Sequence, residues 1–172
     1  VMQLYHMGQN VSFLSKNAFT AREVPFSGRF EGGMLYTCGL DSVGAREGYD
    51  LHGSLHNIPA KVTRVCCDEK GIAAEAEISD TALFGKNLVL CRKIYSAFGS
   101  DTLEISDTLE NRGACAEAYC LLYHVNVGYP MLDAGARVEG DVSQVIPRTV
   151  WAEKQIALRE EISMPEAGVE ET

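Results

Sequence analysis

The sequence predicts an all-β protein built as an antiparallel sandwich or barrel. Hydrophobicity in this chain of 172 residues repeats mostly every second residue, as in half-buried strands. The 16 glycines are spread among many short apolar segments, as turns between short strands require. Hydrophobic residues make up 46% and charged residues 23% of the chain, the balance of a folded globular protein. At this length we expect one domain over residues 1–172.

A β-hairpin is the clearest expected element. Residues 102–110 alternate between apolar and polar side chains, and Asp107 is the one acid on the apolar face. Residues 88–98 form a β-rich run before them, and residues 99–101 (Gly-Ser-Asp) are typical of a turn. We expect the Asp107 carboxylate to have a structural role, tying down the adjacent turn.

Three further strands and one segment that is either helix or loop complete the predicted elements. The strands are expected at residues 34–37, 72–78 and 116–127, of which the last is the longest and most buried. Residues 149–161 have a helix-favouring composition with Thr149 as the N-cap, but their apolar residues form no single stripe. Helix and loop are therefore equal alternatives for this segment.

Charge and hydropathy argue against two classes of partner. The net charge is −9, and the basic residues are scattered rather than gathered on one face. Binding to nucleic acid or to an anionic membrane needs a basic face, so neither partner is expected. No apolar run approaches the length of a membrane-spanning helix, and no signal peptide is visible.

The six cysteines favour free thiols over disulfides. Cys66 and Cys67 are adjacent, which permits a disulfide only with unusual strain, and no CxxC pair is present. Cys91 and Cys120 lie in apolar stretches, where a thiol behaves as a small hydrophobic group. We therefore expect mostly buried, free thiols in a reducing compartment, which predicts a cytoplasmic protein.

Histidines are the best candidates for chemistry. His52 and His56 lie in residues 51–59, a segment interrupted by glycine and proline that is expected to be a loop. His124 and Asn126 share one face of a strand end. Two histidines that converge on a pocket suit acid–base catalysis near neutral pH. The alternative is that each is a hydrogen-bonded structural residue.

The sequence motifs give little support for a metal site or for a catalytic nucleophile. The HxxxH spacing of His52 and His56 presents two ligands together only on a helix, whereas Gly53 favours a loop. A cupin-like metal enzyme would need His52, His56 and His124 to converge on one ion. No GxSxG turn and no glycine-rich phosphate loop is present. We expect neither a metal nor another cofactor.

Several motifs occur together in a recognisable order. Residues 32–44 read GGMLYTCGLDSVG, residues 51–53 read LHG, residues 57–60 read NIPA and residues 123–133 read YHVNVGYPMLD. In this order they resemble the aldose 1-epimerase-related family, in the branch labelled a domain of unknown function and related to galactose mutarotase. Residues 103–113 also resemble a strand shared across mutarotase-like folds.

This resemblance implies an antiparallel β-supersandwich (galactose mutarotase-like) whose concave face holds a small-molecule carbohydrate. In galactose mutarotases a histidine protonates the ring oxygen and a glutamate removes the proton of the anomeric hydroxyl. By resemblance, His124 is the general acid, and His52 holds and polarises the substrate. The substrate contacts expected beside them are Asn126, Asp133, Asp41 and His56.

The chain departs from the family in length. Family members extend further at both ends, and the motif that carries the glutamate base lies downstream of the residues present here. Glu170 and Glu171 do not match that motif, so the general base is unassigned. We expect a fragment or a shortened member, whose open strand edges favour homo-oligomers.

Two functions follow from these expectations. The first is an aldose 1-epimerase-like isomerase that interconverts sugar anomers by acid–base ring opening and closure. The alternative is a non-catalytic carbohydrate-binding domain on the same fold. A carboxylate across the pocket from His124 favours catalysis, whereas a pocket faced only by Tyr36, Tyr123 and Tyr129 favours binding.

Overall fold

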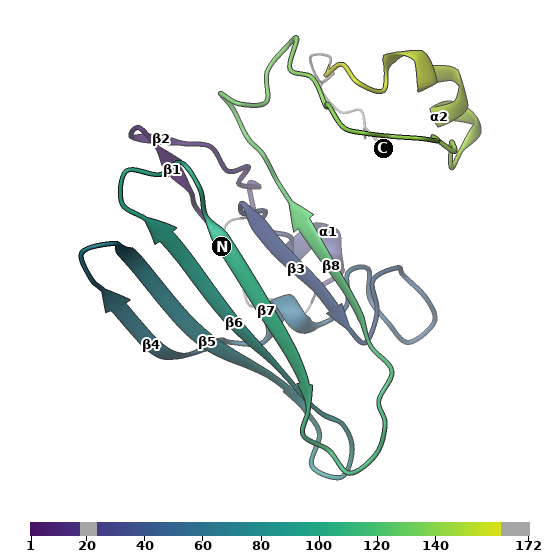
Figure 1. Ribbon diagram of the computed structural model, residues 1–172. Coiled ribbons are helices and arrows are strands. Elements are labelled where there is room, and N and C mark those ends of the chain that lie inside the picture. Colours follow the sequence, from purple (N-terminus) through teal and green to yellow (C-terminus); the bar gives the residue numbers. More distant parts are fainter. Residues whose placement is uncertain (18–23, 163–172) are drawn as a thin grey trace.

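Strands dominate the computed structural model, which describes residues 1–17 and 24–162 (Figure 1). Glu170 and Glu171, considered above as candidates for the general base, lie outside the described residues. In chain order the elements are β1 (Tyr5–His6), β2 (Gln9–Asn10), α1 (Phe26–Arg29), β3 (Leu35–Leu40), the 3-10 helix η1 (Leu55–Asn57), β4 (Lys61–Cys67), β5 (Gly71–Thr81), β6 (Asn87–Ala97), β7 (Glu104–Asn111), β8 (Cys120–Val125), α2 (Val150–Gln155) and the 3-10 helix η2 (Ile156–Leu158).

The larger sheet is an antiparallel meander in the order β4-β5-β6-β7. The predicted hairpin is confirmed as β6 and β7, with Leu90 opposite Leu109 and Ile94 opposite Ile105. The Asp68 carboxylate accepts hydrogen bonds from the Lys70 and Gly71 amides and so shapes the turn into β5. The sequence analysis did not predict β4, whose residues are mostly exposed.

A second, two-stranded sheet pairs β3 with β8, and this antiparallel register places Tyr36 opposite His124. Every residue of β3 is buried. The expectation of a long, buried strand over residues 116–127 is wrong, because β8 has six residues and half of them are exposed. Its burial is lower because, within the described part of the chain, β8 is hydrogen-bonded to β3 alone.

The hydrophobic core joins the two sheets. Leu40 of β3 and Leu55 of η1 pack with Ile78, Leu88 and Leu90 of the larger sheet. Figure 1 shows the β3–β8 pair beside the four-stranded sheet, with α2 set apart from both. The predicted all-β, antiparallel sandwich is therefore confirmed.

The C-terminal helix is shorter than the segment considered from sequence. The Thr149 hydroxyl caps α2 by accepting a hydrogen bond from the Ala152 amide (3.1 Å), as predicted for the N-cap. The helix ends at Gln155 and continues only as η2. Among the described residues, no helix has the length and apolar character to cross a membrane.

All six cysteines are free thiols, but the expectation that most are buried is wrong. Only Cys38, on the buried strand β3, is fully covered. Cys91 and Cys120 are partly exposed because their strands present one face to solvent. Cys67 and Cys115 are exposed.

A buried ion pair within the larger sheet accepts a hydrogen bond from the second sheet. Arg92 of β6 donates to both carboxylate oxygens of Asp107 on β7, at 2.8 and 2.6 Å, and the Tyr123 hydroxyl of β8 donates to one of them at 2.8 Å. The Asp107 side chain is only 3% exposed and that of Arg92 10%. Burial alone would raise the pKa of Asp107, but the hydrogen bonds from Arg92 and Tyr123 and the Arg92 charge hold it below its ordinary value. Asp107 is therefore structural, as expected, but it joins strands rather than the adjacent turn.

Asp107→Ala should lower the free energy of unfolding by about 3 kcal/mol, because it leaves the Arg92 charge buried and unpaired. Tyr123→Phe removes one hydrogen bond and should cost about 1 kcal/mol. Urea unfolding at neutral pH measures both changes. The Asp107 contribution should be complete above its ordinary pKa of 3.8 and lost as the pH falls through the lowered pKa.

The double variant Arg92→Met/Asp107→Leu provides the control. With no charge left to bury, it should regain most of the stability lost in Asp107→Ala. A double variant that is less stable than Asp107→Ala would show that the ion pair itself, rather than an unpaired arginine, determines the loss.

Candidate functional site

Three histidines meet around one buried tyrosine. His124 lies on β8 directly opposite Tyr36 of β3, and His52 and His56 come from the loop between β3 and β4. The His52 and His124 ring centroids are 5.2 Å apart, and the His56 ring stacks on Tyr36 at 4.5 Å. The convergence of His52 with His124, raised from the sequence, is thus present in the fold. We call His52, His56 and His124 the histidine cluster.

Two phenylalanines of α1 and its C-cap form a wall beside the histidine cluster. Phe26 and Phe30 are four residues apart, so the single helical turn places both rings on one side, with centroids 4.9 Å apart. Phe26 lies 4.6 Å from His52, and Phe30 lies 5.8 Å from His124. The sequence analysis missed both, because a four-residue helix carries no periodic signal.

The cluster holds unused hydrogen-bonding capacity. Within the described residues, no hydrogen-bond partner is found for five buried polar atoms at this place: Nδ1 of His52, Nδ1 and Nε2 of His56, Nδ1 of His124 and the hydroxyl oxygen of Tyr36. Buried polar atoms are nearly always hydrogen-bonded in folded proteins. Leaving one unpaired costs about 1–3 kcal/mol. The arrangement therefore lowers stability if its only role is packing. It is suited to a ligand with several hydroxyl groups.

Burial keeps two of the imidazoles neutral. It lowers the pKa of His52, and the neighbouring His124 lowers it further. It lowers the pKa of His56 from 6.5 to about 4, together with the charges of Arg29 and His52, and these effects outweigh the opposing pull of Asp41 and Asp50. A neutral imidazole has one donor and one acceptor nitrogen, so each ring can bridge two hydroxyl groups.

Arg29 and Tyr36 add hydrogen-bond donors beside the histidine cluster. The Arg29 side chain is 11% exposed and donates to the Asp50 carboxylate at 2.8 Å, while its Nε atom is buried with no partner in the described chain. Burial, and to a lesser degree the Glu31 charge, raise the pKa of Tyr36, so its hydroxyl keeps its proton. The sequence analysis named Tyr36 among the aromatic residues that could face the pocket, but it did not select Arg29, because an isolated arginine carries no pattern.

Three other residues that were predicted to contact substrate use their side chains in hydrogen bonds within the protein. The Asn126 side-chain amide donates to the Gly33 and His124 carbonyls at 2.7 and 3.2 Å, which fastens the end of the β3–β8 pair. The Asp133 carboxylate accepts from the Ala134 amide in the exposed loop after β8. The Asp41 carboxylate accepts from Ser42 and Ser54, as described below.

The donor set does not form a metal centre. Within residues 1–17 and 24–162, no group of three or more histidine, cysteine, aspartate or glutamate side chains is arranged to hold a metal ion. Each of the three imidazoles contacts the Tyr36 ring, and the His52 and His124 rings also contact each other. The cupin-like alternative therefore lacks a ligand set in this part of the chain.

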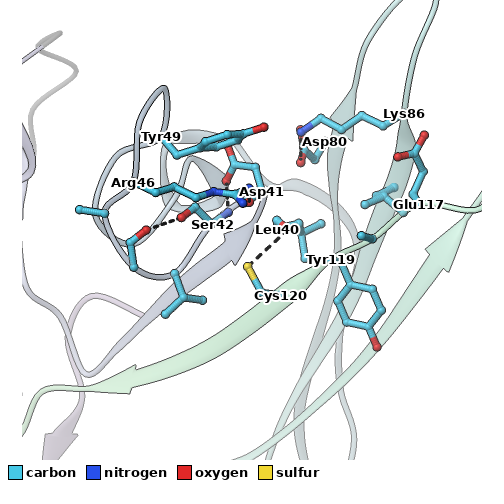
Figure 2. Close-up of a pocket in the computed structure, with 15 residues that line it drawn as sticks. Leu40, Asp41, Ser42, Arg46, Tyr49, Asp80, Lys86, Glu117, Tyr119 and Cys120 are labelled. Carbon is cyan, nitrogen blue, oxygen red and sulfur yellow. Dashed lines mark hydrogen bonds and ion pairs between the residues drawn. The ribbon is translucent and has the colours of Figure 1, made fainter. Parts of the chain in front are cut away.

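Two cavities flank the loop that carries His52. The larger, about 870 Å³, contains none of the three histidines (Figure 2). Both cationic residues that line it are already engaged, Lys86 with Asp80 at 2.7 Å and Arg46 over the Tyr49 ring at 4.1 Å. The smaller, about 750 Å³, also contains none of the three histidines, but it is lined by Phe26 and Phe30, the rings that contact His52 and His124. Phe26 and Phe30 therefore lie between the histidine cluster and the smaller cavity.

Comparison with solved structures supports the fold. A crystal structure described as a putative aldose 1-epimerase from Klebsiella pneumoniae superposes with a TM-score of 0.77 at 20% sequence identity. The match covers 93% of this chain and 46% of that chain, so the present chain spans about half its length. The resemblance to aldose 1-epimerase-related proteins thus holds for the fold.

Comparison with curated proteins gives no match. Among family models, the one described as Domain of unknown function (DUF4432) matches residues 1–172. That match extends over the whole chain, including all the motifs around the histidine cluster. The chain therefore belongs to the DUF4432 family.

Proposed function

We propose that the histidine cluster binds an aldose and contributes acid–base groups that interconvert its anomers, as in an aldose 1-epimerase. The observation that carries this proposal is the set of five buried, unpartnered polar atoms around Tyr36. A sugar offers hydroxyl groups to such atoms and C–H faces to aromatic rings. Phe26 and Phe30 supply those rings beside the imidazoles. Convergent polar groups in an aromatic setting are typical of small-molecule sites.

Each cluster residue has a proposed role. His124, in its protonated form, donates a proton to the ring oxygen as the bond from that oxygen to the anomeric carbon breaks. A base takes the proton of the anomeric hydroxyl, which leaves an open-chain aldehyde. The aldehyde rotates, and closure by the reverse steps gives the other anomer. His52, neutral, holds and polarises the substrate through its unpartnered nitrogen.

Substrate contacts are proposed from the same geometry. His56, Arg29 and Tyr36 each have a buried polar atom without a partner in the described residues, so each is placed to bind a sugar hydroxyl. Contacts from Asn126 and Asp133 remain predictions, as do a cytoplasmic location and homo-oligomers.

One observation favours the second candidate, a carbohydrate-binding domain without catalysis. No hydrogen bond or ion pair joins a carboxylate of the described residues to His52, His56 or His124, so the contacts there identify no general base. Removing one member of an acid–base pair costs ~10²–10⁴ in rate. Such a site would bind a sugar and exchange its anomers poorly.

His124→Asn should abolish anomer exchange while leaving the fold intact, because asparagine cannot protonate the ring oxygen. We expect the rate above the spontaneous exchange to fall ~10²–10⁴-fold. NMR exchange spectroscopy on a panel of aldoses measures it. His6→Asn is the matched control, since His6 lies on β1 with a 52% exposed side chain and should leave the rate unchanged.

An active His124→Asn variant would remove His124 from the mechanism. No exchange by the parent protein, together with broadening of one sugar's resonances, would favour the binding domain.

Stability should fall as the pH drops from 6.5 to about 4, because His56 stays neutral in the folded state over this range while it gains a proton in the unfolded state. His56→Phe keeps a ring to stack on Tyr36 and should reduce this slope. Thermal unfolding at several pH values compares the parent with His56→Phe and His6→Phe. Equal slopes in all three proteins would contradict a neutral, buried His56.

A further inference from the structure

His52 has an unusual backbone. Its φ is +69°, in the left-handed region that side chains other than glycine seldom adopt, and Gly53 follows with the same value. Such a conformation is strained for a residue with a side chain and persists only where its surroundings enforce it. This backbone turns the His52 ring toward Phe26 and His124, at 4.6 and 5.2 Å between centroids.

Main-chain hydrogen bonds hold the two ends of this turn. The His52 carbonyl accepts from the Gly39 amide at the end of β3 (3.1 Å), and the His52 amide donates to the Val43 carbonyl (2.8 Å). The Ser54 amide donates back to the Gly39 carbonyl (3.1 Å). The turn is thus fastened to the buried strand on which Tyr36 lies.

Asp41 closes the turn from the other side. One carboxylate oxygen accepts from the Ser42 and Ser54 amides at 2.9 and 3.1 Å, and the other accepts from the Ser54 hydroxyl at 3.0 Å. Figure 2 shows Asp41 beside Ser42 on the wall of the larger cavity. Both oxygens are engaged with the loop rather than with the histidine cluster.

Gly53 shows how closely Asp41 fits. A Cβ atom added at Gly53 would lie 2.6 Å from the Asp41 carboxylate and 2.6 Å from the Gly39 carbonyl. The carboxylate therefore contacts the backbone directly beside His52. Only glycine at position 53 allows this approach, and its positive φ needs glycine as well.

We propose that Asp41 is a positioning residue, whose three hydrogen bonds to Ser42 and Ser54 hold His52 in its left-handed conformation and aim the imidazole at the substrate. This inference deepens the proposed function and rests on it for its effect on rate. It assigns to Asp41 a role other than the substrate contact expected from the sequence.

The test compares Asp41→Ala with Asp41→Asn. Alanine removes all three hydrogen bonds, whereas asparagine keeps an oxygen for the two amides and an NH₂ group that can donate to the Ser54 hydroxyl. Asp68→Ala is the matched control, because Asp68 also accepts from two amides in a turn, remote from the cluster. Each protein is assayed for anomer exchange and for the NOE between the His52 and Phe26 rings.

We expect Asp41→Ala to lower kcat/KM ~10²-fold, the size of effect that a misplaced group produces, and to lose the NOE. Asp41→Asn should restore both to near the parent level, and Asp68→Ala should change neither. Loss of the NOE in Asp41→Ala and its return in Asp41→Asn would support the positioning role even if the parent exchanges no sugar, an outcome that counts against the proposed function alone.

Three results would overturn the proposal. Asp41→Ala could keep the parent rate and the NOE, which would show that the loop holds His52 without the carboxylate. Asp41→Asn could behave like Asp41→Ala, which would show that charge matters rather than hydrogen bonding. Asp68→Ala could lose the rate and the NOE to the same degree, which would indicate a general loss of stability.

Discussion

The antiparallel pairing of β3 with β8 is the constraint on which the site depends. It places Tyr36 opposite His124, and both strands must keep this register for His124 to face the loop that carries His52. A slip of one residue would turn His124 to the other face of the sheet. Asn126 fastens one end of the pairing through the Gly33 carbonyl. At the other end of β3 the His52 turn is bonded to Gly39, so one buried strand sets the position of all three imidazoles.

The histidine cluster is costly as a structural feature. Two of its imidazoles are held neutral by burial, and four ring nitrogens are buried with no partner in the described residues. Asp107 on β7 shows how the same fold pairs a buried polar group that serves stability, since it receives three hydrogen bonds from Arg92 and Tyr123. The contrast argues against the alternative in which each histidine is a hydrogen-bonded structural residue. Sites kept for function commonly reduce stability in this way.

Local sequence pattern predicted the parts of the fold that depend on neighbouring residues. The alternation in residues 102–110 predicted β7 and its hairpin with β6, and the glycine and proline around His52 predicted a loop. It could not predict that β8 would be short and half-exposed, because that depends on a pairing with β3 across about eighty residues of chain. The hydrogen bonds of Asp107 with Arg92 and Tyr123 were not predicted either, because they also depend on how separate strands pair.

The candidate site likewise contains some residues that the sequence predicted and others that it did not. Histidine chemistry and the family motifs selected His52, His56 and His124 from the sequence. Arg29, Phe26 and Phe30 carry no such signal, since they come from a helix of one turn placed by long-range contacts. Asp41 was selected, but its hydrogen bonds to Ser54 are visible only in the folded loop and give it a different role.

NMR of the four histidine rings during titration with aldoses tests the central claim most directly. Our account predicts that one sugar shifts the ring signals of His52, His56 and His124 together and saturably, while His6 on β1 stays unchanged. Sugar binding that leaves those three signals in place, or that shifts His6 equally, would contradict the histidine cluster as the carbohydrate site.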